Sequence, residues 1–214
     1  MFVVIEGPDG SGKTTQAKRL ADRLRGVTGR EVLSIAIPSD SLVGQAARKC
    51  LKTGLDWKAL FADPQVPPIL IQSTLLADCY GTVQQIRNCL RKGGIVVADR
   101  WAPSGEVYGV IDGVDHEWLT AAQDSLPVGD INFLLDLDVT CICDRLKGKH
   151  VLDVYETESY QRRVVAGYRN LWAMFASKPG GASAWRQINA NRSESEVHED
   201  LFRCVIKWHT SAAY

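Results

Sequence analysis

The chain has 214 residues, of which 45% are hydrophobic and 23% are charged, and its 25 Lys and Arg balance its 25 Asp and Glu. This length suits one compact domain, and zero net charge excludes a surface that neutralises many phosphates, so we expect a single domain over residues 1–214 and no nucleic-acid partner. No apolar run approaches the roughly 20 residues that cross a bilayer, and no basic leader opens the chain, so we expect no membrane partner and a cytoplasmic location, in the host cytoplasm if a virus encodes the chain.

The first segment changes its hydrophobic period after a short apolar run. Residues 2–5 are aromatic or β-branched and predict a strand that ends before Gly7. From Lys13 onward the apolar residues recur every three to four positions, which is the spacing of one helix face. The sequence therefore predicts a strand, a glycine-containing loop and a helix in that order.

Strand-like and helix-like segments alternate along the rest of the chain. Further strands are predicted at 32–37, 95–98, 133–135 and 187–188, and further helices at 42–51, 69–90, 141–146, 156–177 and the C-terminal end. Apolar runs without alternation are typical of parallel strands that are covered on both faces, and parallel strands need crossover connections because a hairpin cannot join them. We expect an α/β fold of three layers, with a five-stranded parallel sheet between two layers of helices.

A phosphate-binding loop is predicted between the first strand and the first helix. Residues 7–14, GPDGSGKT, match the pattern G-x-x-x-x-G-K-[ST]. In such a loop the backbone N–H groups converge on phosphate, Lys13 adds charge near the β- and γ-phosphates, and Thr14 offers a hydroxyl to Mg²⁺. The residues that we expect at ATP are Gly7, Asp9, Gly10, Ser11, Gly12, Lys13, Thr14 and Thr15.

A second polar site follows the predicted strand 95–98. Asp99 and Arg100 come directly after it, at the carboxyl end of a parallel strand, where ligands bind in such sheets. Asp99 can order Mg²⁺ and Arg100 can hold an acceptor phosphate, whereas a structural ion pair is the alternative. About 200 residues after the loop and no second large domain favour a kinase of a small acceptor, with Lys13, Asp99 and Arg100 as catalytic residues.

Three motifs resemble those of the thymidylate kinases, a family of P-loop deoxynucleoside monophosphate kinases. FVVIEGPDGSGKTTQ at 2–16 is similar to the family's glycine loop, and DRWAPSGEVY at 99–108 is similar to its D-R-[YH]-x-x-S-x-x-A-Y motif. DVYE at 153–156 and RVVAGY at 163–168 resemble the segment after its lid. The resemblance covers nearly the whole chain and implies an ATP- and Mg²⁺-dependent P-loop kinase fold with a short lid, which acts in nucleotide biosynthesis as a homodimer.

The same resemblance implies roles for residues around the acceptor. It places Asp9 near the sugar 3′-hydroxyl and the metal, and Tyr108 against the deoxyribose, where a 2′-hydroxyl would not fit. A solvated Asp9 and a core role for Tyr108 are the alternatives. The implied acceptor-binding set also includes Pro38, Ser104 and Tyr155.

The glycine loop lacks the catalytic arginine that some members of the family carry. Gly10 occupies that position, so the lid, at about 145–155, is expected to supply the positive charge. Its basic candidates for catalysis are Arg145 and Lys149, with an ordinary solvated turn as the alternative.

Two residues that recognise the base in the family are replaced here. LLADC at 75–79 aligns with F-x-A-[DN]-R, in which the aromatic ring stacks on thymine and the arginine donates to O4, so Leu75 and Cys79 take their places. An arginine would face the amino group of cytosine with unmatched donors, and its loss therefore favours a 4-aminopyrimidine. The nearby acceptors are Asp78, Gln72 and Glu106, and Gly105 adds room. The family's arginine beside Pro38 is also absent, so Arg100, Arg48 or Lys49 must hold the acceptor phosphate.

These observations predict a nucleoside monophosphate kinase. We expect it to transfer the γ-phosphoryl group of ATP to a pyrimidine deoxynucleoside monophosphate, either dTMP or a 5-substituted pyrimidine such as 5-methyl-dCMP, and to form the diphosphate. Two alternatives remain open at this point. One is a P-loop kinase of a hydroxyl acceptor, such as a nucleoside or a modified base, and the other is a non-catalytic nucleotide-binding module.

Overall fold

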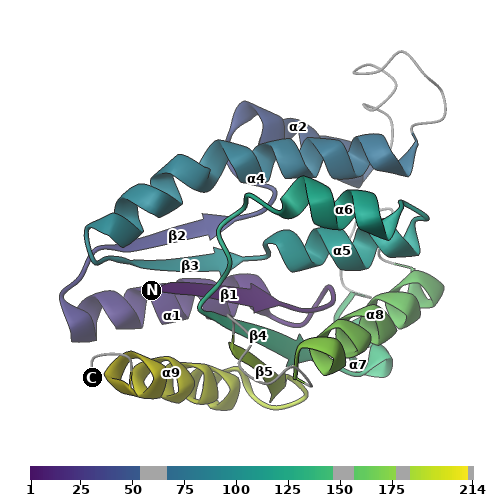
Figure 1. Cartoon of the computed structure of the whole chain (residues 1–214). Helices are drawn as coiled ribbons and strands as arrows, with labels where there is room; N and C mark the ends of the chain where they lie inside the picture. The colour runs from purple at the N-terminus through teal and green to yellow at the C-terminus, as the bar shows by residue number, and fades with distance from the viewer. Residues whose placement is uncertain (54–66, 147–156, 177–183, 212–214) are drawn as a thin grey trace.

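The computed structural model describes residues 1–53, 67–146, 157–176 and 184–211. Within these residues, five strands form one parallel sheet in the order β2-β3-β1-β4-β5 (Figure 1). The strands are β1 (Phe2–Glu6), β2 (Val32–Ala36), β3 (Ile95–Asp99), β4 (Ile131–Asp136) and β5 (Ala184–Asn189). The predicted α/β fold with a five-stranded parallel sheet is thus confirmed.

The described helices connect these strands and cover both faces of the sheet (Figure 1). Their bounds are α1 (Lys13–Thr28), α2 (Leu42–Thr53), α4 (Pro68–Arg91), α5 (Ala102–Ile111), α6 (His116–Gln123), α7 (Val139–Leu146), α8 (Glu158–Ala176) and α9 (Glu194–Ser211). None of them is long and apolar enough to cross a membrane.

The central strand β1 sends alternate side chains into two packed layers. Val3 and Ile5 belong to a buried cluster with α1 and α9, whereas Phe2 and Val4 belong to a cluster with α4. All five residues of β1 are buried, as expected for a parallel strand that is covered on both faces. The glycine loop that follows β1 is therefore fixed to the centre of the sheet.

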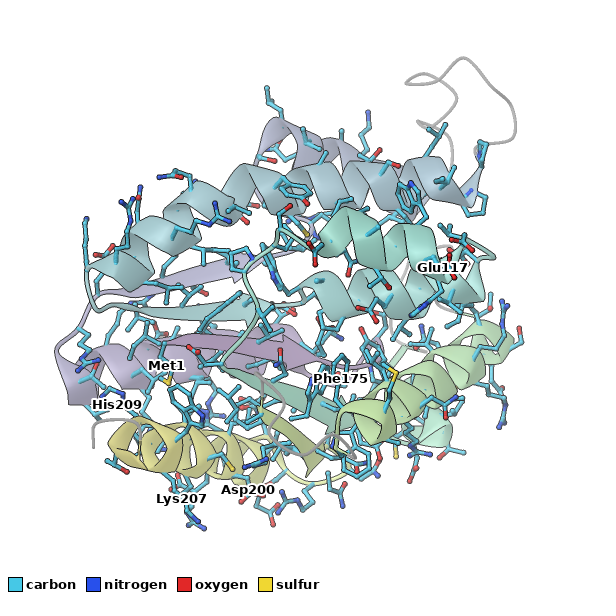
Figure 2. The ribbon with its side chains drawn as sticks, in the orientation of Figure 1. Met1, Glu117, Phe175, Asp200, Lys207 and His209 are labelled. Atoms are coloured by element: carbon cyan, nitrogen blue, oxygen red, sulfur yellow. The ribbon has the colours of Figure 1, made fainter. Side chains whose placement is uncertain are left out.

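A third cluster joins α5 and α8 to β4 and β5. It contains Val107 and Tyr108 from α5, and Val164 and Tyr168 from α8. Next to it Phe175, which is labelled in Figure 2, stacks on Trp185 with 5.6 Å between the ring centroids and 10° between the planes. This packing holds α8 against the sheet, and Tyr168 of the same helix bonds to Glu6 at the carboxyl end of β1, where the glycine loop begins.

The order of the strands places the two predicted polar sites side by side. β1 pairs with β3 in a register that aligns Ile5 with Asp99. After β1 the chain forms β2 and β3 on one side of that strand and then crosses to form β4 and β5 on the other side. Such a change of side creates a crevice at the carboxyl ends of the strands. The glycine loop and Arg100 therefore border the same crevice.

The structure differs from the predicted elements mainly in their extents. The prediction named only residues 187–188 of β5 and did not give bounds for α5 or α6. The lid predicted at about 145–155 lies outside the described residues except for its first two positions, which end α7.

Candidate active site

A cavity of about 670 Å³ opens at the carboxyl ends of β1 and β3. The glycine loop and Arg100 line one part of it, and side chains from α2, α4, α5 and α6 line the rest. The predicted residues that line it are Asp9, Gly10, Gly12, Lys13, Thr14, Thr15, Pro38, Gln72, Leu75, Cys79, Asp99, Arg100, Ser104, Gly105 and Tyr108. Two residue sets that lie about 90 positions apart in the chain thus share one cavity.

The glycine loop depends on a close approach of its backbone to a neighbouring strand. A Cβ at Gly7, whose φ is +147°, would lie 2.7 Å from the carbonyl oxygen of Leu135 in β4. Only glycine fits this conformation and this contact without a shift of the backbone. Gly12 then precedes α1 with a φ of +91°, and Lys13 is the first residue of the helix.

Lys13 is folded onto the loop that it follows. Its Nζ donates to the carbonyl oxygen of Pro8 at 2.6 Å and to Oγ of Ser11 at 3.4 Å. Burial, followed by the nearby charge of Arg100, lowers the pKa of Lys13 to about 8. A buried ammonium group with so low a pKa gains most from an anion placed beside it, which is what a polyphosphate provides.

Thr14 and Asp99 form the candidate metal site. Oγ1 of Thr14 donates to Oδ2 of Asp99 at 2.6 Å across the two neighbouring segments. A hydroxyl and a carboxylate are hard oxygen ligands, and Mg²⁺ typically takes one or two such groups from the protein beside phosphate and water. The chemistry of the pair therefore fits Mg²⁺.

Arg100 lies at the centre of a hydrogen-bond network. Its backbone has a φ of +67°, which is uncommon for a residue with a side chain, and its guanidinium donates to Oδ1 of Asp9 at 2.5 Å. The same guanidinium donates to the hydroxyl of Tyr168 at 3.1 Å and to that of Tyr108 at 3.3 Å. Further acceptors are the carbonyl oxygen of Gly7 and Oγ of Ser104.

Asp9 is therefore part of the Arg100 network. Its Oδ2 accepts from the hydroxyl of Tyr108 at 3.3 Å and from Nε2 of Gln161 at 3.1 Å. The structure places its carboxylate with these donors, whereas the metal candidates Thr14 and Asp99 bond to each other. Gln161 is a residue of the site that the sequence analysis did not single out.

Glu6 is the second residue that the sequence analysis missed. It is completely buried and accepts from three donors, namely the backbone N–H of Trp101 at 2.8 Å, Oγ of Ser104 at 2.6 Å and the hydroxyl of Tyr168 at 2.9 Å. Burial raises the pKa of its carboxyl group. The sequence did contain a feature that could have indicated its role, because a glutamate ends an otherwise apolar strand and an unpaired charge there would be very costly in free energy.

The acceptor side of the cavity contains residues from three helices. Gln72, Leu75 and Cys79 line it from α4, and burial raises the pKa of the Cys79 thiol well above its usual value. Arg48 lines it from α2 and donates to the carbonyl oxygen of Pro38 at 2.5 Å. The helix α6, which had no predicted role, adds Trp118, Leu119, Ala122 and Gln123.

The structure does not bring Asp78 into the cavity. Its carboxylate accepts from the backbone N–H of Ser39 at 2.6 Å, from Oγ of Ser39 at 2.5 Å and from Oγ of Ser41 at 2.7 Å. These bonds tie α4 to the loop before α2. Asp78 thus supports one wall of the cavity from behind.

The predicted lid residues lie partly outside the described chain. Lys149 and Tyr155 fall within 147–156 and are not described. Arg145 donates to the carbonyl oxygen of Gly10 at 2.9 Å and to that of Ala190 at 3.1 Å, so it joins the glycine loop to the end of β5. A Cβ at Gly10 would lie 3.6 Å from Cβ of Arg145, which shows how closely the two segments approach.

Comparison with known proteins gives a consistent set of relatives. Residues 5–201 match the family model described as thymidylate kinase. The chain is 33% identical over 207 residues to a probable thymidylate kinase of Pyrococcus abyssi and 31% identical over 208 residues to one of Pyrococcus horikoshii, with 95% of each chain covered. It is also 32% identical over 211 residues to a thymidylate kinase of Pelotomaculum thermopropionicum, with 95% of this chain and 92% of that one covered.

Proposed function

Because this chain belongs to the thymidylate kinase family, we propose that it transfers the γ-phosphoryl group of MgATP to the 5′-phosphate of a pyrimidine deoxynucleoside monophosphate. The family consists of nucleoside monophosphate kinases with ATP as the donor, so the chain is an enzyme of this class. The identity of the base, the metal and a homodimeric state belong to the proposal.

One observation carries the proposal. A single cavity is lined both by the glycine loop with Lys13 and by Arg100, from two adjacent strands. The first group suits the polyphosphate of a donor, and the second suits the phosphate of an acceptor. A module that only binds a nucleotide has no need for the second group.

The residues act mainly by positioning and by charge. A phosphate monoester dianion is a competent nucleophile at neutral pH, so no side chain has to remove a proton from the acceptor. Lys13 holds the β- and γ-phosphates, and Arg100 holds the acceptor phosphate. Thr14 and Asp99 would hold Mg²⁺, which neutralises part of the phosphate charge when it is bound.

The sugar of the acceptor lies, in this proposal, against the cluster of Asp9 and Tyr108. The two side chains are joined by a hydrogen bond, and the Tyr108 ring lies 5.2 Å from the Arg100 guanidinium carbon. A rigid ring here disfavours a 2′-hydroxyl, because that group would lose its water without gaining a partner. The acceptor is therefore a deoxynucleotide.

The base lies, in this proposal, on the side of the cavity with Leu75 and Cys79. Neither side chain can donate to O4 of thymine as an arginine does, which favours a 4-aminopyrimidine such as 5-methyl-dCMP as the acceptor, with dTMP as the alternative. An apolar wall at this position also leaves room for a substituent on C5.

The test is ADP release from ATP in a coupled assay with a panel of acceptors. The proposal expects release with deoxypyrimidine monophosphates and little release with nucleosides or without an acceptor. Release with nucleosides alone would indicate a hydroxyl acceptor, and no stimulation by any acceptor would indicate a binding module. Turnover of dTMP far faster than that of dCMP and 5-methyl-dCMP would overturn the proposal that the acceptor carries a 4-aminopyrimidine base.

A further inference from the structure

Two glutamine side chains line the cavity from different helices, and each has a buried amide atom. Gln72 of α4 has only 3% of its surface exposed, and its Nε2 has no hydrogen-bond partner among the described residues. Gln123 of α6 lines the same cavity, and its buried Oε1 also lacks a partner there. One unpaired donor and one unpaired acceptor are therefore held inside a site that is otherwise rich in apolar side chains.

Gly105 explains how both amides reach the same place. A Cβ at this position would lie 2.6 Å from Nε2 of Gln123 and 3.8 Å from Oε1 of Gln72. The two amide groups thus border one point above Gly105, and the missing side chain is what admits Gln123. Gly105 belongs to α5, so three helices meet here.

The surroundings of the two amides suit a flat aromatic ligand. Leu75 and Cys79 from α4, and Trp118 and Leu119 from α6, line the cavity beside them. Figure 2 shows Glu117, the exposed neighbour of Trp118, at the outer surface of α6, which marks the solvent side of this helix. A buried amide with an unmet hydrogen bond costs free energy, and a ligand edge with both a donor and an acceptor removes that cost.

We infer that Gln72 and Gln123 are the residues that recognise the base, by binding the N3–C4 edge of the pyrimidine in place of the family's arginine. The inference rests on the proposed function, because it assigns the base end of the acceptor site. Thymine offers a donor at N3 and an acceptor at O4, whereas cytosine offers an acceptor at N3 and a donor at N4. A carboxamide carries both kinds of group and reverses them by rotating through 180°, which an arginine cannot do.

The pair therefore accepts both kinds of pyrimidine. We expect kcat/KM values for dTMP and dCMP within tenfold of each other.

The experiment compares dTMP, dCMP and the 2-pyrimidinone deoxynucleoside monophosphate, which has hydrogen in place of the 4-substituent. With the unaltered enzyme we expect kcat/KM for this analogue to be at least tenfold lower than that for dTMP or dCMP. Gln72→Leu and Gln123→Leu are expected to lower kcat/KM for dTMP and dCMP at least tenfold and to abolish the difference from the analogue. Gln85→Leu, an exposed glutamine on the same helix α4, is the matched control and is expected to change neither value.

A second variant tests the geometry without removing an amide. Gly105→Ala places its Cβ against Nε2 of Gln123 and is expected to reduce turnover of dTMP about as much as Gln123→Leu does. The double variant, with both Gly105→Ala and Gln123→Leu, is expected to turn over dTMP no more slowly than either single variant, because both substitutions remove the same interaction. Unchanged ATP binding by each variant shows that it is folded.

The outcomes separate this inference from the proposed function. If no monophosphate stimulates the unaltered enzyme, the proposed function fails. If pyrimidine monophosphates are turned over but the two Gln→Leu variants keep the full preference over the analogue, the amide pair does not recognise the base. Values of kcat/KM for dTMP and dCMP that differ by more than tenfold in the unaltered enzyme would show that the amides do not rotate to accept both bases.

Discussion

Arg100 donates five hydrogen bonds to residues around the cavity. It bonds to the glycine loop, to α5 and to α8, so three segments that are distant in the chain fix one guanidinium. Residues that are held in this way act with little rearrangement, because their rotamers are already fixed before a phosphate binds. Glu6 belongs to the same network through Ser104 and Tyr168.

Lys13 gives the site a pH dependence that can be measured. Its pKa of about 8 in the free enzyme means that the ammonium group loses its proton as the pH rises through 8, and with it the positive charge that we propose for binding ATP. We expect kcat/KM for ATP to fall above pH 8, because this parameter reports the ionisation of the free enzyme. The same depressed pKa means that the folded protein binds fewer protons than the unfolded chain between about pH 8 and 10.5, so its stability increases with pH there.

A Lys13→Arg variant is the control for this pH dependence. Arginine stays charged over the whole pH range. The pH profile of kcat/KM for ATP of this variant should therefore lack the decline above pH 8, even where the activity of the variant is lower than that of the unaltered enzyme. A flat profile to pH 9.5 in the unaltered enzyme would contradict the assignment.

Glu6 is expected to contribute to stability as well as to the site. Glu6→Gln keeps the shape of the side chain, but an NH₂ group replaces one of the two carboxylate oxygens. This NH₂ group cannot accept the hydrogen bond that the oxygen accepted, and it points toward a donor. Hydrogen bonds to a buried charged group contribute about 1.5–3 kcal/mol, so we expect the free energy of unfolding to fall by about 2 kcal/mol and KM for the acceptor to rise. Urea denaturation measures the first effect. Glu117→Gln, at an exposed position on α6, should change the free energy of unfolding by less than about 0.5 kcal/mol.

At the scale of elements, α7 is coupled to the glycine loop. Arg145 in its last turn bonds to carbonyl oxygens at Gly10 and Ala190, and both groups lie at the carboxyl edge of the sheet. The side chain therefore supports the glycine loop, for which we propose binding of the phosphates of ATP. If that proposal holds, we expect a change at Arg145 to alter donor binding.

We expect Arg145→Ala to weaken ATP binding about tenfold, because two bonds from a charged donor are lost, and water replaces much of the energy of the exposed bond to Gly10 and some of that of the part-buried bond to Ala190. Calorimetry with a non-hydrolysable ATP analogue measures the effect directly. Arg162→Ala, an exposed arginine of α8, is the matched control. An unchanged dissociation constant for the Arg145 variant would show that the loop holds its shape without this tie.

The elements also show how far the sequence could be interpreted. The strand at 2–5, the helix from Lys13 and the strand at 95–98 were predicted, because buried parallel strands and the glycine loop carry strong local patterns, and the structure has them as β1, α1 and β3. The grouping of Lys13, Thr14, Asp99 and Arg100 followed from the rule that the ends of parallel strands share one edge.

Other features depend on contacts that no local pattern encodes. Gln123 faces the cavity only because α6 packs against α4 and α5, and Asp78 faces the loop before α2 because of the rotation of α4. The prediction of Asp78 as a base acceptor rested on its position in the chain, which does not give the direction of a side chain on a helix within one turn. Glu6 was visible in the sequence, but its partners are Trp101, which precedes α5, Ser104 in α5 and Tyr168 in α8.

At the scale of the whole molecule, the order of the strands produces the active site. β1 and β3 are neighbours although about 90 residues separate them, and each is followed by a group that we propose to bind phosphate. The helices α4, α5 and α6 then close the cavity on the acceptor side (Figure 1). The central claim is that this one cavity holds both nucleotides at once, with their phosphates toward each other.

A molecule that joins both substrates tests this claim most directly. In adenosine 5′-pentaphosphate-5′-deoxythymidine, five phosphates link the two nucleosides, and calorimetry measures its binding to the unaltered protein and to Arg100→Met. We predict one molecule bound per chain, with at least hundredfold higher affinity than dTMP or ATP alone, and a large loss of this advantage in the variant. Binding no tighter than that of ATP, or binding that ATP displaces but dTMP does not, would contradict a shared cavity.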